Sequence, residues 1–563
     1  MSNFPDPPRP MRPTSFKEID KALRRLLGGK HPWARLGTEK RALLLEECIT
    51  DLKMVADEWV PTVCRGKGHL PGSPGEGETW IGSFMLIMRN LRLLHHAMKH
   101  KAAPPLISSS QNANGQHVAK VFPLDSKEKL LFQGFDAELW VEPGKDLTQG
   151  KSYREEQKSG KIALVLGAGN QGSIAPMDCL HKLFVENEVC ILKLNPVNDY
   201  LGPYIIRAFR SLIDGNYLSV VYGGAEVGKY LCQHELVQTI HITGSAKTHD
   251  AIVWGENPKE QKSRKEANDP ICKKPVTSEL GCVDPIMVVP GPWTDKQIDY
   301  QARQIVSMAT HNAGFNCNSG DVVLMPKGWD KSTQLTERII QHMQNCPPKK
   351  AFYPGTQERY QSYVDHYSDA IICGERTDEI VPWTVFPNVP AQKGEMILSQ
   401  ESFCGLLSIT EVDANDPVSY LEKAVPFCND NIFGSLSCNM LIHPKTQSAN
   451  RDAFAKAKAD LKYGAIGINA WNGVVYGLCT TSWGPYPGNK LSDIGSGIGS
   501  IHNTFLIDYP QKSIVTAPFT ISPTPAWFYD NRNTVQLGRN LFRFETKPSW
   551  INFARVAIQG LRG

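Results

Sequence analysis

The sequence has no long apolar run, and this absence limits how the chain relates to membranes. None of its hydrophobic stretches approaches the roughly 18 to 20 uncharged residues that a membrane-spanning helix needs. It also shows no apolar region of the secretory-signal type. We therefore expect a chain without a transmembrane segment and with a cytoplasmic location.

A large charge imbalance is missing as well. The 61 Lys and Arg residues nearly cancel the 57 Asp and Glu residues, which leaves a formal charge of +4, and no long basic block appears. Nucleic-acid-binding surfaces normally carry a clear excess of basic residues, so we expect no nucleic-acid partner. The balance favours small or neutral partners.

Closely spaced cysteine pairs are also absent. The fourteen cysteines are scattered from Cys48 to Cys479 without a CxxC pair. In a chain this long, such scatter indicates free thiols in a reducing compartment rather than a disulfide framework. By default each is a small buried apolar residue, and a nucleophile needs further support.

The sequence does contain enough chain for a large α/β protein. Its 563 residues exceed what one hydrophobic core serves, so we expect two or three domains. Residues 1–14 are proline-rich and predict an extended, poorly ordered arm. Residues 15–100 have helical periodicity, which predicts that Leu43, Cys48 and Leu52 share a core-facing side.

Strand and helix patterns then alternate. Buried-strand patterns at 161–166 and 188–194 flank a helical pattern at 175–184, which predicts a βαβ unit. Further strand patterns follow at 219–224 and 236–242. This order predicts a mostly parallel sheet with helices on both faces.

Other segments differ from this alternation. Residues 71–77 are rich in Pro and Gly and predict a loop, while 120–124 and 137–141 are strand-like and predict a hairpin. The polar run 257–274 predicts a solvated insertion. A second α/β series from 285 onward predicts another domain.

A glycine-rich loop lies between the first predicted strand of the βαβ unit and its helix. Residues 167–172 read Gly-Ala-Gly-Asn-Gln-Gly, the GxGxxG pattern of a loop that brings a pyrophosphate to a helix N-terminus. A tight turn is the plain alternative. The acidic residue expected about twenty positions later is missing, because Lys193 and Asn195 stand there. We therefore do not prefer the ordinary Rossmann interpretation.

Two downstream motifs are more specific. Residues 278–282 read Ser-Glu-Leu-Gly-Cys, and residues 312–320 read Asn-Ala-Gly-Phe-Asn-Cys-Asn-Ser-Gly. Together they resemble the aldehyde dehydrogenase superfamily, in which a Glu-Leu-Gly-Gly motif precedes a cysteine in an Asn-x-Gly-x-x-Cys context. Glu279 and Cys317 keep that order at a separation of 38 residues.

The resemblance continues in order over roughly residues 30–500. Asn170 falls where an asparagine amide of the family helps to bind an oxyanion, so the resemblance replaces the dinucleotide interpretation of the glycine loop. Lys193 falls where a lysine contacts the adenosine ribose of the cofactor. Gly244 and Ser245 match a Thr-Gly-Ser turn at a pyrophosphate-binding helix.

A further match concerns the nicotinamide end. Residues 400–405 resemble a Glu-x-Phe-Gly-Pro segment whose glutamate holds the nicotinamide ribose, with one extra residue before the glycine here. The resemblance therefore implies cofactor contacts for Glu401 and Phe403. Gly281, in the glutamate motif, belongs to the same implied site.

The resemblance implies oxidation of an aldehyde to a carboxylic acid with NAD or NADP as hydride acceptor. Cys317 attacks the carbonyl and forms a thiohemiacetal and then a thioester; its thiolate is available near neutral pH when neighbouring charges or dipoles lower its pKa. Asn170 and the Cys317 backbone N–H stabilise the oxyanion, and Glu279 activates the hydrolytic water. The implied substrate is a small-molecule aldehyde.

The implied fold has a Rossmann-like cofactor domain, a second α/β catalytic domain and a small β element for bridging or oligomerisation. The expected division is a disordered arm at 1–14, a cofactor domain at 15–119 and 145–285, a catalytic domain at 286–480, a bridging element at 120–144 and 481–515, and an aromatic and basic tail at 516–563. Because family members assemble through such a hairpin and strand, we expect a homodimer or homotetramer. The tail predicts packing on protein, and its composition also permits peripheral membrane contact.

Several departures from the family pattern keep alternatives open. Cys282 replaces a motif glycine, and His249 replaces a glycine beyond the Thr-Gly-Ser turn, where it could displace the pyrophosphate. Pro196 stands where many members carry a glutamate that repels a 2′-phosphate, so NADP is not excluded. The alternatives are a coenzyme A-acylating or reductive relative, against which Glu279 argues, and a catalytically silent scaffold.

Overall fold

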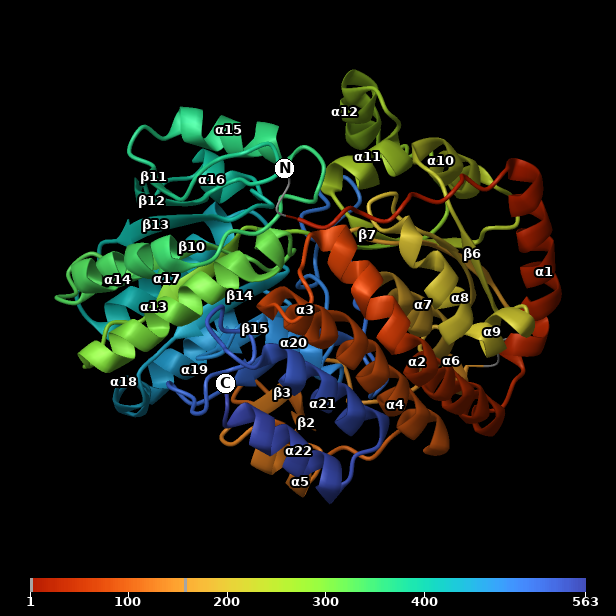
Figure 1. Cartoon of the computed structure of the whole chain (residues 1–563), viewed down its shortest axis with the longest axis horizontal. Coiled ribbons are helices and arrows are strands. Elements are labelled where there is room, and N and C mark those ends of the chain that lie inside the picture. Colours follow the sequence, from red (N-terminus) through yellow and green to blue (C-terminus); the bar gives the residue numbers. More distant parts are fainter. Residues whose placement is uncertain (1–3, 156–158) are drawn as a thin grey trace.

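Two β-sheets organise the chain, and the computed structural model describes residues 4–155 and 159–563 (Figure 1). The smaller sheet lies on the right of the view and the larger on the left. Each sheet forms a lobe with the helices that cover it, and each lobe has its own large apolar core. The mixed α/β architecture predicted from the sequence is confirmed.

The smaller sheet has six strands in the order β16-β8-β7-β4-β5-β6. All its strand pairs are parallel except β16–β8. Every side chain of β4 is buried, as its uninterrupted apolar sequence predicts for a strand covered on both faces. Its strands are β4 (Ile162–Leu166), β5 (Val189–Lys193), β6 (Leu218–Val221), β7 (Thr239–Gly244), β8 (Val276–Leu280) and β16 (Gly497–Ile498).

Helices from the first third of the chain share the core of this sheet. The predicted βαβ unit is confirmed, because α7 connects the parallel strands β4 and β5. The helices and helical turns of this lobe are α1 (Phe16–Ala34), α2 (Thr38–Lys67), α4 (Leu86–Lys99), α6 (Lys151–Arg154), α7 (Ile174–Phe184), η2 (Asp199–Leu201), α8 (Gly202–Ala208), α9 (Arg210–Asp214), α10 (Ala225–Gln233), α11 (Ala246–Trp254) and α12 (Pro258–Ala267).

The larger sheet has eleven strands in the order β1-β2-β3-β17-β15-β14-β9-β10-β13-β12-β11. Its central strands, from β17 to β12, run parallel. Its strands are β1 (Ser108–Gln111), β2 (His117–Phe122), β3 (Asp136–Val141), β9 (Asp284–Val288), β10 (Gly320–Pro326), β11 (Ile371–Cys373), β12 (Trp383–Val389), β13 (Leu406–Val412), β14 (Ser437–Leu441), β15 (Ala465–Ile468) and β17 (Pro510–Thr516).

The larger sheet carries its own set of helices, which begins after β9. These are α13 (Asp295–Thr310), η3 (His311–Gly314), α14 (Ser332–Asn345), α15 (Thr356–His366), α16 (Met396–Ser399), α17 (Pro417–Asn431), α18 (Pro444–Ala449), α19 (Arg451–Asp460) and α20 (Gly473–Leu478). This series is the second α/β run predicted from the sequence.

The predicted hairpin strands and the late strand extend this same sheet. β2 and β3 pair antiparallel, with the short helix α5 (Ser126–Leu131) between them. β17 then lies between β3 and β15, antiparallel to the first and parallel to the second. β2, β3 and β17, in the segments that the resemblance assigns to bridging, therefore pair within the larger sheet of their own chain, whereas β16 pairs with β8 of the smaller sheet.

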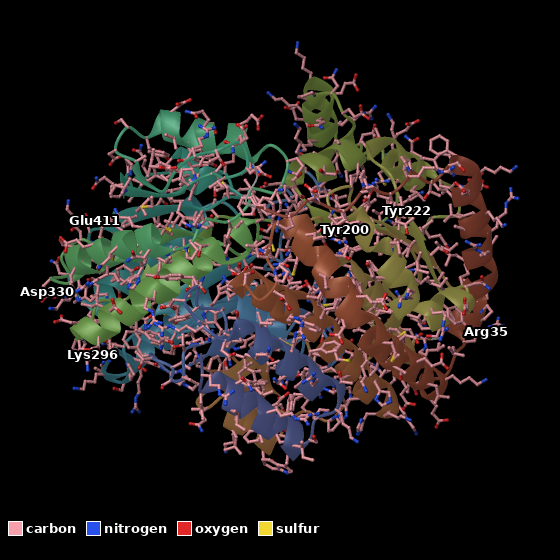
Figure 2. The ribbon with its side chains drawn as sticks, in the orientation of Figure 1. Arg35, Tyr200, Tyr222, Lys296, Asp330 and Glu411 are labelled. Carbon is pink, nitrogen blue, oxygen red and sulfur yellow. The ribbon has the colours of Figure 1, made fainter. Side chains whose placement is uncertain are left out.

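The N-terminal arm is extended, as predicted, but it is held in place. The backbone N–H of Thr14 donates to the carbonyl oxygen of Tyr222 at 3.0 Å, and the N–H of Tyr222 donates to the Thr14 hydroxyl at 2.9 Å. The N–H of Met11 donates to Asp199 at 3.2 Å. Tyr222 lies in the smaller-sheet lobe (Figure 2). The prediction of poor order is wrong for residues 4–14, while residues 1–3 lie outside the described residues.

Two local predictions also need correction, and a third needs an addition. Leu43 is 53% exposed although Cys48 and Leu52 are fully buried, because its position on α2 turns it away from the face that they share. The predicted loop at 71–77 ends early, since α3 (Pro74–Thr79) begins with proline in its first turn, where a missing N–H costs nothing. The polar run 257–274 is solvated, as predicted, because α12 buries no side chain. Much of this run is helical, which the prediction did not include.

The C-terminal tail is helical and packs on the protein. α21 (Thr534–Thr546) contacts α3, α4 and the π-helix η1 (Trp80–Met85), and α22 (Trp550–Gly560) contacts α21 and α5. Both lie at the bottom of the view, in blue (Figure 1). In the described ranges, no helix combines the length and the apolar character needed to cross a bilayer.

Candidate active site

One large cleft, of about 1210 Å³, lies between the two sheets. Its walls include the carboxyl ends of the parallel strands β4, β5 and β7, where ligands of open α/β sheets usually bind. All nine residues predicted for catalysis and cofactor binding line this cleft. They are Asn170, Lys193, Gly244, Ser245, Glu279, Gly281, Cys317, Glu401 and Phe403.

Cys317 follows a turn with an unusual backbone. Asn312, Ala313 and Gly314 have positive φ angles of 53°, 58° and 76°. Glycine tolerates this region and asparagine visits it more readily than most residues, whereas alanine pays a steric cost. The turn places Cys317 between the end of η3 and the start of β10. Of the fourteen cysteines, only Cys317 and Cys272 are not fully buried.

A network of amides supports this turn, and the sequence analysis assigned no role to its central member, Asn312. The Asn312 amide donates to the backbone oxygens of Asn170 at 3.1 Å and Phe315 at 3.0 Å. The Asn170 amide donates to the same Phe315 oxygen at 2.9 Å. One of the two Asn170 amide hydrogens is thus occupied, and the side chain is fixed beside Cys317.

Lys67 is a second residue that the sequence analysis missed. Its buried ammonium donates to the Asn312 side-chain oxygen at 2.8 Å and to Gln171 at 2.7 Å. Burial lowers the pKa of Lys67 to about 7. Nothing local in the sequence indicates this contact, because 245 residues separate Lys67 from Asn312.

Glu279 and Cys317 titrate in each other's field. Burial raises the pKa of Glu279 to about 7, and the Asp178 carboxylate acts in the same direction. Burial also raises the pKa of the Cys317 thiol, and the carboxylates of Glu279 and Glu401 raise it further. The lowered thiol pKa that would favour a resting thiolate is therefore not found. The thiol needs a proton acceptor, and Glu279 is the adjacent carboxylate.

Glu401 lies against Gly281 at the floor of the cleft. A Cβ atom at position 281 would come within 2.2 Å of a Glu401 carboxylate oxygen, so a larger residue there would displace this carboxylate. Within the described ranges, the buried Glu401 Oε1 has no hydrogen-bond partner. Burial raises the pKa of Glu401 well above its usual range. An unpaired buried carboxylate oxygen is costly, which indicates a site made for a ligand hydroxyl.

Arg359 holds the segment that carries Glu401 and was not predicted. Its guanidinium donates to the backbone oxygens of Ser402 at 3.2 Å and Phe403 at 3.3 Å. Phe403 has a positive φ of 45°, and its ring packs 5.0 Å from that of Tyr353. The extra residue in this motif is thus accommodated by a fixed, strained backbone.

The opposite end of the cleft presents positive groups. Ser245 is the N-cap of α11, and its hydroxyl accepts from the Thr248 N–H at 3.2 Å. The free N–H groups of a helix start favour a phosphate. Lys193 lines the same end, and burial lowers its pKa.

The glycines of the GxGxxG loop are explained by packing within the protein. A Cβ at Gly167 would come 2.8 Å from the Ala175 side chain, and one at Gly169 would come 2.8 Å from Asn195. Close approach of protein groups, rather than of a pyrophosphate, accounts for both. This agrees with the preference for Asn170 as the functional residue of the loop.

Two departures from the family pattern do not obstruct the cleft. His249 is fully buried and is not among the described residues that line the cleft. It therefore does not displace a pyrophosphate there, contrary to the expectation from the sequence. Cys282 is buried, and its thiol donates to the backbone oxygen of Cys317 at 3.5 Å. Both side chains are accommodated inside the protein.

A second cavity, of about 180 Å³, opens on the other side of the cysteine. Cys317 and Asn170 line both this cavity and the cleft. A small molecule in the second cavity and a larger one in the cleft would therefore meet at the thiol. The arrangement suits a reaction between a small substrate and a bound cofactor.

Solved structures with the same fold share most of the chain length. The aldehyde dehydrogenase of Mycobacterium tuberculosis, complexed with NAD+, matches with a TM-score of 0.61 and 15% identity over 92% of both chains. The NADP-dependent glyceraldehyde-3-phosphate dehydrogenase of Bacillus halodurans, complexed with NADP, matches with a TM-score of 0.58 and 16% identity. It covers 89% of this chain and 91% of that chain. At these identities the likeness establishes the fold.

Relatives by sequence match over shorter segments. An N-succinylglutamate 5-semialdehyde dehydrogenase of Novosphingobium aromaticivorans is 26% identical over 34% of this chain and 38% of its own length. A 1-pyrroline-5-carboxylate dehydrogenase of Bacillus pumilus is 22% identical over 49% of this chain and 50% of its own length. The chain thus spans half or less of the length of these relatives.

The family itself is defined by a longer match. The sequence pattern of the aldehyde dehydrogenase family fits residues 181–507, which is more than half of the chain. That segment contains Glu279, Cys317 and Glu401, which the fold brings to one cleft. The chain therefore belongs to the aldehyde dehydrogenase family.

Proposed function

We propose that the protein oxidises an aldehyde to a carboxylic acid with NAD or NADP as hydride acceptor. The observation that carries this proposal is the position of Cys317, at the junction of a cofactor-sized cleft and a smaller cavity. The complexes of related structures with NAD+ and NADP support a nicotinamide cofactor.

The residues of the cleft fit such a cofactor. The unpaired Glu401 oxygen suits ribose hydroxyls, and Gly281 leaves room beside it. The N-terminus of α11 at Gly244 and Ser245 suits the pyrophosphate, and Lys193 the adenosine ribose. When bound there, the nicotinamide ring accepts a hydride from the substrate carbon.

The first chemical step belongs to Cys317. Its sulfur attacks the aldehyde carbon and gives a thiohemiacetal, while Glu279, whose pKa is about 7, takes the thiol proton. The free hydrogen of the Asn170 amide and the Cys317 backbone N–H stabilise the developing oxyanion. Each such donor typically contributes about 3 to 4 kcal/mol to the transition state.

The second step releases the acid from the thioester on Cys317. Once Glu279 has passed the thiol proton to solvent, its carboxylate removes a proton from a water molecule that attacks the acyl carbon, and the thiolate leaves. A carboxylate with a pKa near 7 suits this role at neutral pH. Its presence argues against the coenzyme A-acylating and reductive alternatives, and the unobstructed cleft argues against a silent scaffold.

The choice between NAD and NADP is left open in this proposal. Pro196 leaves the position beside Lys193 without a carboxylate that would repel a 2′-phosphate. Parallel titrations of the two cofactors measure the preference.

We also propose a domain assignment. Residues 15–119 and 145–285, which form the smaller-sheet lobe apart from β1 and the starts of β2 and β9, bind the cofactor, and the larger-sheet lobe, at 286–480, carries the nucleophile. The separate cores of the two lobes support this assignment. The segments 120–144 and 481–515 link them.

Assembly and location complete the proposal. A homodimer or homotetramer, measured by light scattering, is supported by apolar side chains that α22 exposes, among them Trp550, Ile551 and Ile558. The same side chains would support peripheral membrane contact, which co-sedimentation with vesicles tests. A cytoplasmic location is supported by the fourteen cysteines, all described and all free, and cell fractionation tests it.

The direct test follows reduction of NAD and of NADP with a panel of aldehydes, for the wild type and Cys317→Ala. We expect turnover by the wild type and a loss of at least about 1000-fold in Cys317→Ala, because no other group in the site can form the thioester. Cys373→Ala, which changes a thiol of β11 that is not among the described residues lining the cleft or the second cavity, is the control and should keep wild-type activity. Equal turnover by wild type and Cys317→Ala would remove the nucleophile from the proposal.

A further inference from the structure

The second cavity is walled mainly by apolar side chains. They come from η1, from the segment around α20 and from the C-terminal tail, and include Ile81, Met85, Val474, Tyr476, Trp527 and Leu541. Cys317 lies in the wall of this cavity. If the proposed function holds, the substrate carbonyl lies at Cys317 and the rest of the substrate lies among these groups.

The C-terminal tail forms part of the cavity wall. The tail lies outside the segment that matches the family pattern. The family pattern ends at residue 507, whereas Trp527 and Leu541 line the cavity. Trp527 also packs edge-on against Phe135, 6.5 Å between ring centroids. Part of the substrate-facing wall therefore comes from the tail.

The tail is docked by close backbone approach, so its wall is a built feature. A Cβ at Gly538 of α21 would come 2.7 Å from the Cβ of Trp80 in η1. A Cβ at Gly77 of α3 would come 2.3 Å from the Thr534 side chain of α21. These glycines let α21 lie directly on α3 and η1.

Charges beside the cavity compensate one another. Arg89, buried in α4, forms ion pairs of 2.8 Å with Glu128 and with Glu545 of α21. Arg92 pairs with Glu545 at 2.5 Å. Two arginines thus meet two glutamates and the cluster carries no net charge, although one guanidinium nitrogen of Arg89 has no hydrogen-bond partner among the described residues. Burial of an unpaired carboxylate in such a site is costly.

The size of the cavity narrows the substrate further. Its volume of about 180 Å³ is close to that of an apolar protein cavity of about 150 Å³ that holds benzene. Two- and three-carbon aldehydes would leave much of this space unfilled. Aliphatic or aromatic chains of about six to eight carbons would fill it.

We propose that the C-terminal tail makes this enzyme selective for uncharged, apolar aldehydes of about six to eight carbons. The contrast is with the relatives named for semialdehyde or pyrroline carboxylate substrates, which carry a carboxylate. Selectivity arises because each methylene buried in the cavity favours the bound state about fourfold. Trp527 and Leu541 are the tail residues that set it.

The test compares kcat/KM for propanal, hexanal, benzaldehyde, butanal and succinic semialdehyde. For the wild type we expect hexanal to exceed propanal by about 10- to 50-fold, and butanal to exceed succinic semialdehyde by at least 100-fold. In Trp527→Ala the ratio of hexanal to propanal should fall by about 5- to 20-fold. Trp550→Ala, which changes an exposed tryptophan on α22, should keep the wild-type ratios.

Binding without turnover separates this inference from the proposed function. Calorimetric titration with hexanamide, which the enzyme cannot oxidise, should show binding that weakens about 5- to 20-fold in Trp527→Ala. Circular dichroism, with Trp527→Phe as the conservative variant, shows whether the fold is kept. If no aldehyde is oxidised but hexanamide binds in this pattern, the proposed function fails and the apolar site stands. If aldehydes are oxidised without dependence on chain length, or equally by wild type and Trp527→Ala, the tail selectivity is overturned.

Discussion

At the residue scale, the site is defined by a thiol surrounded by carboxylates. Glu279 and Glu401 both raise the pKa of Cys317. Under the proposed mechanism, the resting protein keeps the Cys317 thiol protonated and Glu279 half ionised near neutrality, since the Glu279 pKa is about 7. Reactivity then depends on transfer of one proton between two adjacent groups.

The Glu279 pKa has a consequence for stability. Its folded value of about 7 exceeds the ordinary value of 4.5, so the folded state keeps a proton that the unfolded chain releases between these two pH values. Stability therefore falls as pH rises from about 4.5 to about 7, and stays reduced above it. We expect Glu279→Gln to raise the free energy of unfolding by up to about 3 kcal/mol at pH 8. The gain should vanish at pH 4.5.

Urea unfolding at the two pH values measures this effect. Glu411→Gln, which changes an exposed glutamate at the rim of the larger-sheet lobe (Figure 2), is the matched control and should change neither value by more than about 0.5 kcal/mol. A gain of equal size at both pH values would show that the burial of the ionised carboxylate is not its cause.

Sequence motifs predicted the residues of the cleft but not what holds them. All nine predicted residues line it, because each stands in a short motif next to a strand end. Lys67 and Arg359 escaped prediction, since their partners lie 245 and 43 to 44 residues away in the chain. Contacts of this kind depend on the assembled fold and leave no local pattern.

At the element scale, apolar runs predicted buried strands correctly, whereas the sequence did not predict how helices contact one another. The uninterrupted apolar sequence of β4 predicted a doubly covered strand, and the structure has one. The docking of α21 depends on two glycines in separate helices, Gly77 and Gly538, which are complementary only after folding. Leu43 is exposed because periodicity alone did not predict which side of its helix faces the core.

A single methyl group tests how tightly the tail is docked. Gly538→Ala places a Cβ 2.7 Å from the Cβ of Trp80, so α21 or η1 must shift. We therefore expect the free energy of unfolding to fall by about 1 to 3 kcal/mol. Gly28→Ala in α1, where nothing lies within 4 Å of the new Cβ, should instead stabilise by about 0.5 to 1 kcal/mol. Thermal melts of both variants give the comparison. A stabilised Gly538→Ala would show that α21 is not held at this distance.

At the scale of the whole molecule, the site belongs to both lobes. Asn170 and Lys193 come from the smaller-sheet lobe, and Cys317 and Glu401 lie within the second α/β series. The hairpin and β17 add to the larger sheet of their own chain, and the tail then crosses to α3 and η1. A strand pattern predicted the hairpin and the resemblance predicted the late strand, but the partners of these segments were a matter of topology that no segment encodes by itself.

The central claim is that Cys317 carries the acyl group of the substrate. Intact-protein and peptide mass spectrometry of the wild type, quenched with acid during turnover of hexanal with either cofactor, tests it most directly, because acid stops the hydrolysis of a thioester. The account predicts one adduct on the peptide of Cys317, with the mass of the aldehyde less two hydrogens. An unmodified Cys317, or the adduct on another cysteine, in a protein that has reduced the cofactor would contradict it.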